Sequence, residues 1–428
     1  MNRPPRLGAA LEELFGRCRI ERLDNGLRVC LLVNRQAPLV ATALWYQAGT
    51  RHEPAGQEGI AHFLEHMMFK GSPRFGAGEI DRLTQSAGGS NNAFTGHDAT
   101  CYYFTFSRDR WRLALDVEAD RMAALTLDPA EVERERRVVL EEIAMYEDDP
   151  WDALELAAYR GVYAGHPYGR PVLGTRESLA RIGAAELARF HRDHYRPDNA
   201  VLVVAGDVDE TALAEVERRF SHLAAGTSPP VSPPAGWGGA VPQRREPLEI
   251  RRRHGSRPRL LVALPAPAGD VPEYADLWLA VTVLAGGRAS RLHRALVDDG
   301  RLCASVSADV TEMVGPGLCL IAAEPLGDEE CEPAEAVLRA ELAGLAGSLA
   351  EEELERARRL LLSDWVFAIE RIHQQALVAG GSLSRFRPEV VTEFLRRVEG
   401  ATAAQVRSAA EKHLVLRPPG VVAWSLPA

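Results

Sequence analysis

The 428-residue chain lacks both a long apolar run and a surplus of positive charge. No segment approaches the roughly 18 uninterrupted apolar residues of a membrane helix, so we expect no membrane partner. The formal net charge of −10 disfavours nucleic-acid binding. If this charge lined a cavity it would attract basic peptides, whereas a charge spread over the outside would not.

Cysteine pairs with metal-binding or redox spacing are also missing. The six cysteines, at 18, 30, 101, 303, 319 and 331, include no Cys-x-x-Cys and lie mostly in apolar runs, which favours reduced structural thiols. Residues 1–18 are expected to form a helix rather than a signal peptide, because Glu12 and Glu13 interrupt any apolar core. Cytoplasmic residence is the simplest interpretation, and a periplasmic location stays open.

The most informative stretch that is present is His-Phe-Leu-Glu-His at residues 62–66. Apolar residues around it recur at helical spacing and predict a helix over about 58–69. In that helix His62 and His66 lie one above the other, with Glu65 beside them. A histidine pair at this spacing is more often part of a core than a metal site. Burying Glu65 without a partner would cost several kcal/mol, however, and a divalent cation at the two imidazoles would remove that cost.

A catalytic zinc site generally needs a third protein ligand and leaves the fourth position to water. Asp128 and Pro129 have the types expected at a helix start, and they predict a helix running to about Tyr146. Glu142 is the best candidate in it, because apolar residues at i−4, i−3, i+3 and i+4 place its carboxylate on an apolar stripe. Glu135, about two turns earlier on the same face, could orient the ligands. Without the histidine pair, a solvated Glu/Arg face would be the preferred interpretation.

Together these features resemble the pitrilysin and mitochondrial-processing-peptidase family of inverted zincins, bacterial short-chain type, in which His-x-x-Glu-His replaces the usual order. Further stretches carry the same resemblance: 23–29, 49–53, 59–71, 133–136, 139–143, 165–170, 194–199 and 203–207. The resemblance implies one zinc ion per chain, held by His62, His66 and Glu142. It also implies that Glu65 is the general base of peptide-bond hydrolysis and that Glu135 is a supporting acid.

Residues 88–95 are typical of a glycine turn that leads into a strand, and the strand pattern resumes over 100–104. An exposed strand edge can accept an extended peptide as an added strand. The resemblance implies that Asn92, Ala93 and Phe94 contact the substrate. On the residues alone, an ordinary hairpin with an Asn-rich turn is equally compatible.

The chain is too long for one ordinary core, since domains average about 150 residues. Residues 224–246 are rich in Pro, Gly, Ala and Ser, which predicts a linker between an N-terminal zinc-binding lobe (1–223) and a C-terminal lobe without metal ligands (247–428). A faint repeat at an offset of 219 supports two related α+β lobes; it matches Glu186, Leu187, Phe190 and His194 with Gln405, Val406, Ala409 and His413.

Each lobe is expected to mix helices and strands. Residues 351–379 predict one long amphipathic helix, and residues 259–264 predict a short strand. The resemblance implies two similar lobes, each an antiparallel sheet packed with helices, that close over a central cavity.

The second lobe departs from the family pattern. Residues 279–283, which correspond to the histidine motif, contain no His or Glu, so no second zinc site is expected. Many relatives carry an Arg and a Tyr, seven residues apart, that hold the substrate; here these positions fall on Val297 and Ala304. Arg294 and Arg301 have the right spacing but lie outside the family register.

This departure predicts the zinc-binding subunit of a heterodimer, with a homologous partner that supplies the Arg/Tyr pair. One alternative is a homodimeric peptidase with different substrate anchoring. Another is a non-catalytic structural subunit, which would have no need of Glu65 beside a metal pair.

Overall fold

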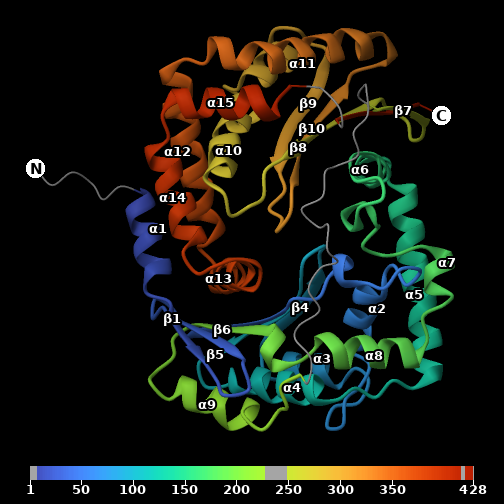
Figure 1. Cartoon of the computed structure of the whole chain (residues 1–428), viewed down its shortest axis with the longest axis vertical. Helices are drawn as coiled ribbons and strands as arrows, with labels where there is room; N and C mark the ends of the chain where they lie inside the picture. Colours follow the sequence, from blue (N-terminus) through green and yellow to red (C-terminus); the bar gives the residue numbers. More distant parts are fainter. Residues whose placement is uncertain (1–6, 227–247, 416–419, 428) are drawn as a thin grey trace, which may run out of the picture.

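The structure, a computed structural model, describes residues 7–226, 248–415 and 420–427 (Figure 1). It contains two β-sheets, each packed with helices, and thus confirms the predicted α+β class. Most of the predicted linker lies outside the described residues; only 224–226 are included. Within these ranges, no helix is both long and apolar enough to cross a membrane. Cytoplasmic residence stays a prediction from the sequence.

The first sheet has six strands in the order β1-β2-β6-β3-β5-β4. Their bounds are β1 Arg19–Arg22, β2 Arg28–Val33, β3 Leu39–Tyr46, β4 Ser90–Thr95, β5 Thr100–Ser107 and β6 Ala200–Gly206. All neighbouring strands are antiparallel except β2 and β6, which are parallel. The expectation of a purely antiparallel sheet is therefore wrong for this one pair. β4 lies at the edge, because it pairs only with β5 among the described strands.

Nine helices belong to the first half of the described chain: α1 Leu7–Gly16, α2 Ile60–Met67, α3 Glu79–Ser86, α4 Arg112–Ala123, α5 Pro129–Asp148, α6 Pro150–Val162, α7 Arg176–Leu179, α8 Ala184–His194 and α9 Ala212–Phe220. Short 3₁₀ turns cover Thr50–His52, Pro167–Gly169 and Pro197–Asn199. Strand residues alternate between two faces, and the face carrying Leu44, Tyr102 and Leu202 packs in one core with α2, α4, α8 and α9.

The second half repeats this arrangement. Its strands are β7 Leu248–Arg253, β8 Arg259–Ala266, β9 Cys303–Val310, β10 Gly317–Pro325 and β11 Val421–Leu426. Its helices are α10 Pro272–Ala285, α11 Asp328–Ser348, α12 Glu351–Ala368, α13 Ile372–Arg385, α14 Val390–Gly400 and α15 Ala403–His413, with a π-helical turn at His293–Asp298. The strand order β7-β11-β8-β10-β9 corresponds to β2-β6-β3-β5-β4. The bounds of α8 and α15 differ by the same 219 residues as the sequence repeat.

The two halves exchange a helix. α6 packs on β8 and β11 of the second sheet, with Leu154 and Ala158 in one core with Leu261 and Val421. α13 packs on β3 and β6 of the first sheet. Figure 1 shows the first sheet between α13 on one side and α4, α8 and α9 on the other. Each sheet is therefore completed by a helix from the other half.

Each exchanged helix has a glycine where it contacts the sheet of the other half. These two glycines are also 219 residues apart. A Cβ atom at Gly161 of α6 would lie 2.7 Å from Val421 Cγ2. A Cβ atom at Gly380 of α13 would overlap the Trp45 ring of β3. The absence of a side chain lets each helix approach the opposite sheet.

The single helix predicted over 351–379 is wrong. The chain forms α12 and α13 instead, because the backbone leaves the helical conformation at Ile369 and is extended at Arg371 (φ −84°, ψ 135°). This break redirects α13 onto the first sheet, and tertiary packing of this kind overrides local helical periodicity.

The exchange makes Gly380 sensitive to substitution. We expect Gly380→Ala to lower the free energy of unfolding by about 1–3 kcal/mol, because the buried Trp45 must move. Gly344→Ala in α11 is the control, since a Cβ there meets no atom within 4 Å. Chemical denaturation should show the control unchanged or more stable; equal effects of the two variants would contradict the close contact.

Candidate functional site

The helix that carries the histidine motif, α2, begins at a buried carboxylate. Gly59 precedes it in the left-handed conformation (φ 90°), and Glu53 Oε1 accepts hydrogen bonds from the backbone N–H groups of Gly59 (3.0 Å) and Ala61 (3.1 Å). Burial raises the pKa of Glu53 to about 8, although these hydrogen bonds oppose the shift. Sequence reasoning gave Glu53 no role. An acidic residue shortly before a helix start is the signal that points to it.

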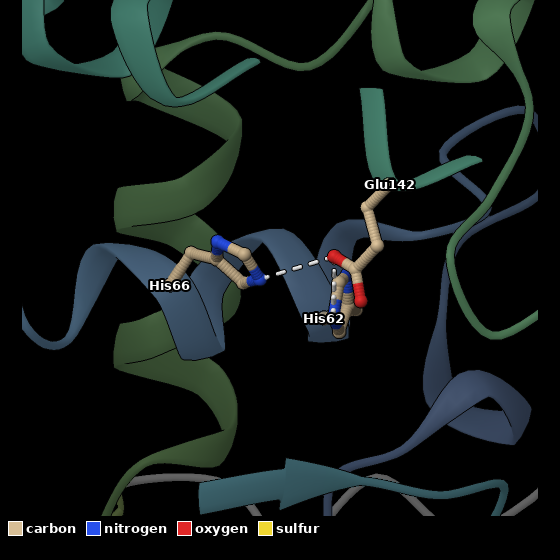
Figure 2. Close-up of side chains that lie close together, drawn as sticks. All are labelled: His62, His66 and Glu142. Atoms are coloured by element: carbon tan, nitrogen blue, oxygen red, sulfur yellow. Dashed lines mark ion pairs between the residues drawn. The ribbon is translucent and has the colours of Figure 1, made fainter. Parts of the chain in front are cut away.

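Three side chains from α2 and α5 converge, as Figure 2 shows. The ligand atoms of His62, His66 and Glu142 lie within 4.8 Å of one another. Glu142 Oε2 is 3.6 Å from His62 Nε2 and 3.5 Å from His66 Nε2. Neighbouring ligands of a tetrahedral zinc ion lie about 3.3–3.4 Å apart when the zinc–nitrogen distance is about 2.0–2.1 Å. The donor set and the two distances from Glu142 therefore fit zinc.

The two imidazoles differ electrostatically. Burial and the neighbouring His66 lower the pKa of His62 to about 4, so His62 is neutral, which is the form that binds a metal. Burial also lowers the pKa of His66, but hydrogen bonds to Glu135 and Glu142 outweigh it and raise the value to about 9. The carboxylates of Glu135 and Glu142 thus favour a positive charge at His66.

Glu135 contacts the ring nitrogen of His66 that faces away from Glu142. Its Oε1 lies 2.8 Å from His66 Nδ1, which leaves Nε2 facing Glu142. Its other oxygen forms an ion pair with Lys70 Nζ at 2.6 Å. The supporting role expected for Glu135 stays a prediction. Sequence reasoning assigned Lys70 no role.

Glu65 lies on the same helix and is 9% exposed. Burial raises the pKa of its carboxyl group, and a hydrogen bond from Thr95 opposes the shift. Thr95 Oγ1 donates to Glu65 Oε2 at 2.5 Å. Because Thr95 is the last residue of β4, this bond joins the candidate base to the edge strand. Sequence reasoning assigned Thr95 no function.

The apolar stripe invoked for Glu142 is only partly correct. Val139 is buried, but Val138, Met145 and Tyr146 are 49%, 71% and 49% exposed. α5 packs against α2 and α6, so only one side of it is covered. Glu142, with 30% of its side chain exposed, lies at the border between the buried and the open face.

The expected substrate contacts lie on the edge strand. Asn92, Ala93 and Phe94 belong to β4, in which exposed and half-buried residues alternate. Phe94 is 40% exposed and meets Trp45 edge to face, with ring centroids 5.3 Å apart. The described part of β4 thus offers a free backbone edge close to Glu65.

Two models of known protein families match most of this sequence. Residues 28–176 match the family described as Insulinase (Peptidase family M16). Residues 181–361 match the description Peptidase M16 inactive domain. The chain belongs to the M16 peptidase family. The resemblance to pitrilysin-type peptidases is therefore confirmed.

Several proteins resemble this M16 chain over most of its length. An "uncharacterized zinc protease" of Rickettsia bellii is 30% identical over 408 residues, which is 93% of this chain and 97% of that protein. The "uncharacterized zinc protease YmxG" of Bacillus subtilis is 34% identical over 284 residues, or 66% of this chain and 68% of that protein. The crystal structure of a protease from Helicobacter pylori has a TM-score of 0.87 at 21% identity, covers 96% of this chain and 99% of that chain, and shows the shared two-lobe fold.

The two positions at which the family resemblance leads one to expect Arg and Tyr are occupied by small or apolar residues here. Val297 is half-buried in the π-helical turn, and Ala304 is exposed on β9. Arg294 and Arg301 are exposed, and Arg301 has a positive φ of 50°. Within the described chain, neither arginine forms an ion pair with the His62–His66–Glu142 group.

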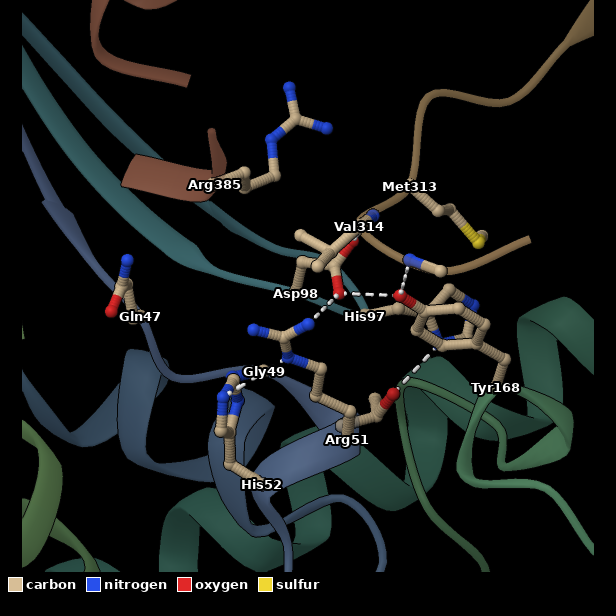
Figure 3. A network of polar contacts seen from close by, with 12 residues as sticks. Gln47, Gly49, Arg51, His52, His97, Asp98, Tyr168, Met313, Val314 and Arg385 are labelled. Carbon is tan, nitrogen blue, oxygen red and sulfur yellow. Dashed lines mark hydrogen bonds and ion pairs between the residues drawn. The ribbon is translucent and has the colours of Figure 1, made fainter. Parts of the chain in front are cut away.

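A buried polar network joins the M16 lobes at the end of the edge strand (Figure 3). Asp98, in the turn between β4 and β5, accepts hydrogen bonds from Tyr168 Oη (2.7 Å) and from the backbone N–H of Val314 (2.9 Å). It also pairs with Arg51 at 3.1 Å. Val314 lies between β9 and β10, and its neighbour Gly315 donates to Tyr168 Oη. No local sequence pattern predicts this network, because its members come from four separate segments.

Asp98 should be essential for stability of the M16 fold. We expect Asp98→Ala to lower the free energy of unfolding by about 3–5 kcal/mol, because it removes the carboxylate facing the buried Arg51 guanidinium. Asp109→Ala is the control, since that side chain is 68% exposed and pairs only locally. Thermal or urea unfolding of the two variants measures the difference, and similar losses would contradict the network's importance.

Proposed function

We propose that this M16 chain is a zinc-dependent endopeptidase. One observation carries the proposal: two imidazole nitrogens and a carboxylate oxygen lie within 4.8 Å of one another beside a further buried carboxylate, Glu65. His62, His66 and Glu142 would hold one zinc ion. Zinc held there supplies Lewis acidity, which lowers the pKa of water to about 7 and polarises a carbonyl group. The zinc proteases among the relatives support this assignment.

Glu65 is the general base in this proposal. Its carboxylate accepts a proton from the attacking water and then delivers that proton to the leaving amine, so no covalent intermediate forms. The hydrogen bond from Thr95 fixes the orientation of the carboxylate. Glu135 in turn fixes the His66 ring.

The substrate is an extended peptide that adds to the free edge of β4. Asn92, Ala93 and Phe94 are the proposed contacts. Support comes from the bond between Thr95 and Glu65, because a peptide lying along β4 runs toward the proposed base. The identity of the peptide is not part of the proposal.

We further propose a heterodimer in which this chain is the zinc-binding subunit. Val297 and Ala304 cannot donate a hydrogen bond from their side chains, and one lost oxyanion donor costs about 10²–10³ in turnover. A homologous partner would provide the missing Arg/Tyr side. A homodimer with different substrate anchoring is the alternative. A purely structural subunit fits less well, because it needs no buried Glu65 beside a metal-binding group.

Replacement of Glu65 tests the chemistry. Glu65→Gln should keep stoichiometric zinc and lower turnover by about 10²–10⁴, because it removes the base but none of the ligands. Zinc content and cleavage of a fluorescence-quenched peptide library are the measurements. Retained peptidase activity in the zinc-loaded variant would rule out the assignment.

A matched pair of α5 variants controls this experiment. Glu142→Gln should lose zinc, whereas Glu141→Gln, on the exposed neighbouring residue, should lose neither zinc nor turnover. Zinc retention in Glu142→Gln would remove the third ligand from the proposal.

The partner is tested by the activity of the chain alone. Purified without a partner, it should bind zinc but cleave peptides at least about tenfold more slowly than with a co-expressed homologue that has the Arg/Tyr pair. Full activity of a monomer or homodimer, measured together with mass by light scattering, would refute the heterodimer.

A further inference from the structure

Two cysteines meet at the edge of the first sheet, where β1 pairs with β2. Ile20 of β1 is directly opposite Cys30 of β2, so their side chains share one face of the sheet. Cys18 stands two residues before Ile20, and alternation along an extended chain brings its side chain to the same face. Cys18 accordingly packs against the cluster of buried residues that contains Cys30. A hydrogen bond links the two thiol groups.

The two thiols differ in their access to solvent. Cys18 is partly exposed, whereas the other five cysteines are buried, and all six are free thiols in this structure. Cys18 also lines a cavity of about 190 Å³ together with Phe15, Ile20 and Leu383. Cys30 has an exposed fraction of 0%. A small solute can therefore reach Cys18 but not Cys30.

The hydrogen bond makes the exposed thiol the more reactive one. The bond from Cys30 lowers the pKa of the Cys18 thiol, although burial opposes this shift. The same bond, together with burial, raises the pKa of Cys30. The thiolate is the nucleophilic form of cysteine, and redox-sensing cysteines combine partial exposure and thiolate character with a second thiol close by.

We propose that Cys18 and Cys30 form a modification site at which a hydroperoxide introduces a reversible disulfide bond. The Cys18 thiolate attacks the O–O bond of the peroxide, which oxidises the sulfur to a sulfenic acid and releases hydroxide or alkoxide. The Cys30 sulfur then attacks the sulfenic sulfur: an S–S bond forms, the S–O bond breaks, and the Cys30 proton leaves with the hydroxide as water. A dithiol reverses the reaction by exchange.

The disulfide joins two segments with different surroundings. Cys18 follows α1, which packs on α12 and α14 of the second half (Figure 1). Cys30 lies in β2 of the first sheet. Oxidation therefore fastens the connection between α1 and the first sheet, and the site does not depend on the proposed zinc chemistry.

Disulfide mapping in the whole chain tests the proposal. The reduced protein is treated with hydrogen peroxide, the remaining thiols are alkylated, and trypsin then cleaves after Arg19, Arg22 and Arg28, which lie between the two cysteines. We expect a joined pair of peptides that contain Cys18 and Cys30, and we expect dithiothreitol to separate them. Cys18 should be consumed at least about tenfold faster than any of the buried cysteines.

Variants separate the two steps. Cys30→Ala keeps Cys18 but removes its partner, so dimedone should trap at least about twice as much Cys18 sulfenic acid as in the wild type. Cys18→Ser should give neither sulfenic acid nor the disulfide. Cys331→Ala is the matched control, because it removes another buried thiol, 7% exposed, on α11. It should form the disulfide as the wild type does.

A peroxide-treated wild type in which Cys18 and Cys30 are both recovered as alkylated thiols would overturn the inference. Cys18 oxidised only to sulfinic acid, or joined to a second copy of the chain, would also overturn it, because Cys30 would then not be its partner. Mass spectrometry of the wild type decides among these results without any variant, so the test stands even if Cys30→Ala fails to fold.

Discussion

Burial of carboxylates beside two histidines is the constraint on which the rest of the first lobe depends. Glu65 and Glu135 are both nearly inaccessible, and each carries an interaction that offsets the cost of desolvation. Thr95 donates to Glu65, and His66 and Lys70 flank Glu135. Glu142 completes the arrangement from α5. A zinc ion, if held as proposed, would neutralise this group and would account for so many acids in one place.

The position of Glu142 is linked to the second lobe through consecutive helices. Asp149 ends α5 and caps α6 by accepting hydrogen bonds from the backbone of Trp151 and Asp152. α6 then packs on the second sheet, while α13 returns to the first. The helix carrying the proposed third ligand is therefore oriented by contacts in both lobes. Asp98 adds a direct link between the lobes at the end of β4.

Local signals predicted the elements that carry the site. The apolar spacing around His62 predicted α2, and the Asp128-Pro129 start predicted α5. The predicted bounds agree with the observed ones to within about two residues, because capping and periodicity are encoded locally. Glu142 does lie beside His62 and His66, and its role as a ligand stays a prediction. The argument from an apolar stripe was partly wrong, since exposure of Met145 depends on which neighbours cover α5.

Features that depend on the second lobe could not be predicted in this way. The break between α12 and α13 serves packing on a distant sheet, and the helical pattern of 351–379 contains no sign of it. Asp98 meets Val314 across the lobes, although neither residue stands in a distinctive motif. Gly161 and Gly380 follow the 219-residue repeat. The reason for glycine at each position appears only in the folded structure, in which Val421 packs against Gly161 and Trp45 packs against Gly380.

The central claim is that His62, His66 and Glu142 together hold zinc. X-ray absorption spectroscopy of the purified, zinc-loaded protein tests it most directly, because the method reports the elements around the metal and their distances. The account predicts four or five nitrogen and oxygen ligands at about 2.0–2.2 Å, including imidazole scattering from two histidines. Sulfur ligands at about 2.3 Å, or a zinc ion surrounded by water oxygens without imidazole, would contradict it.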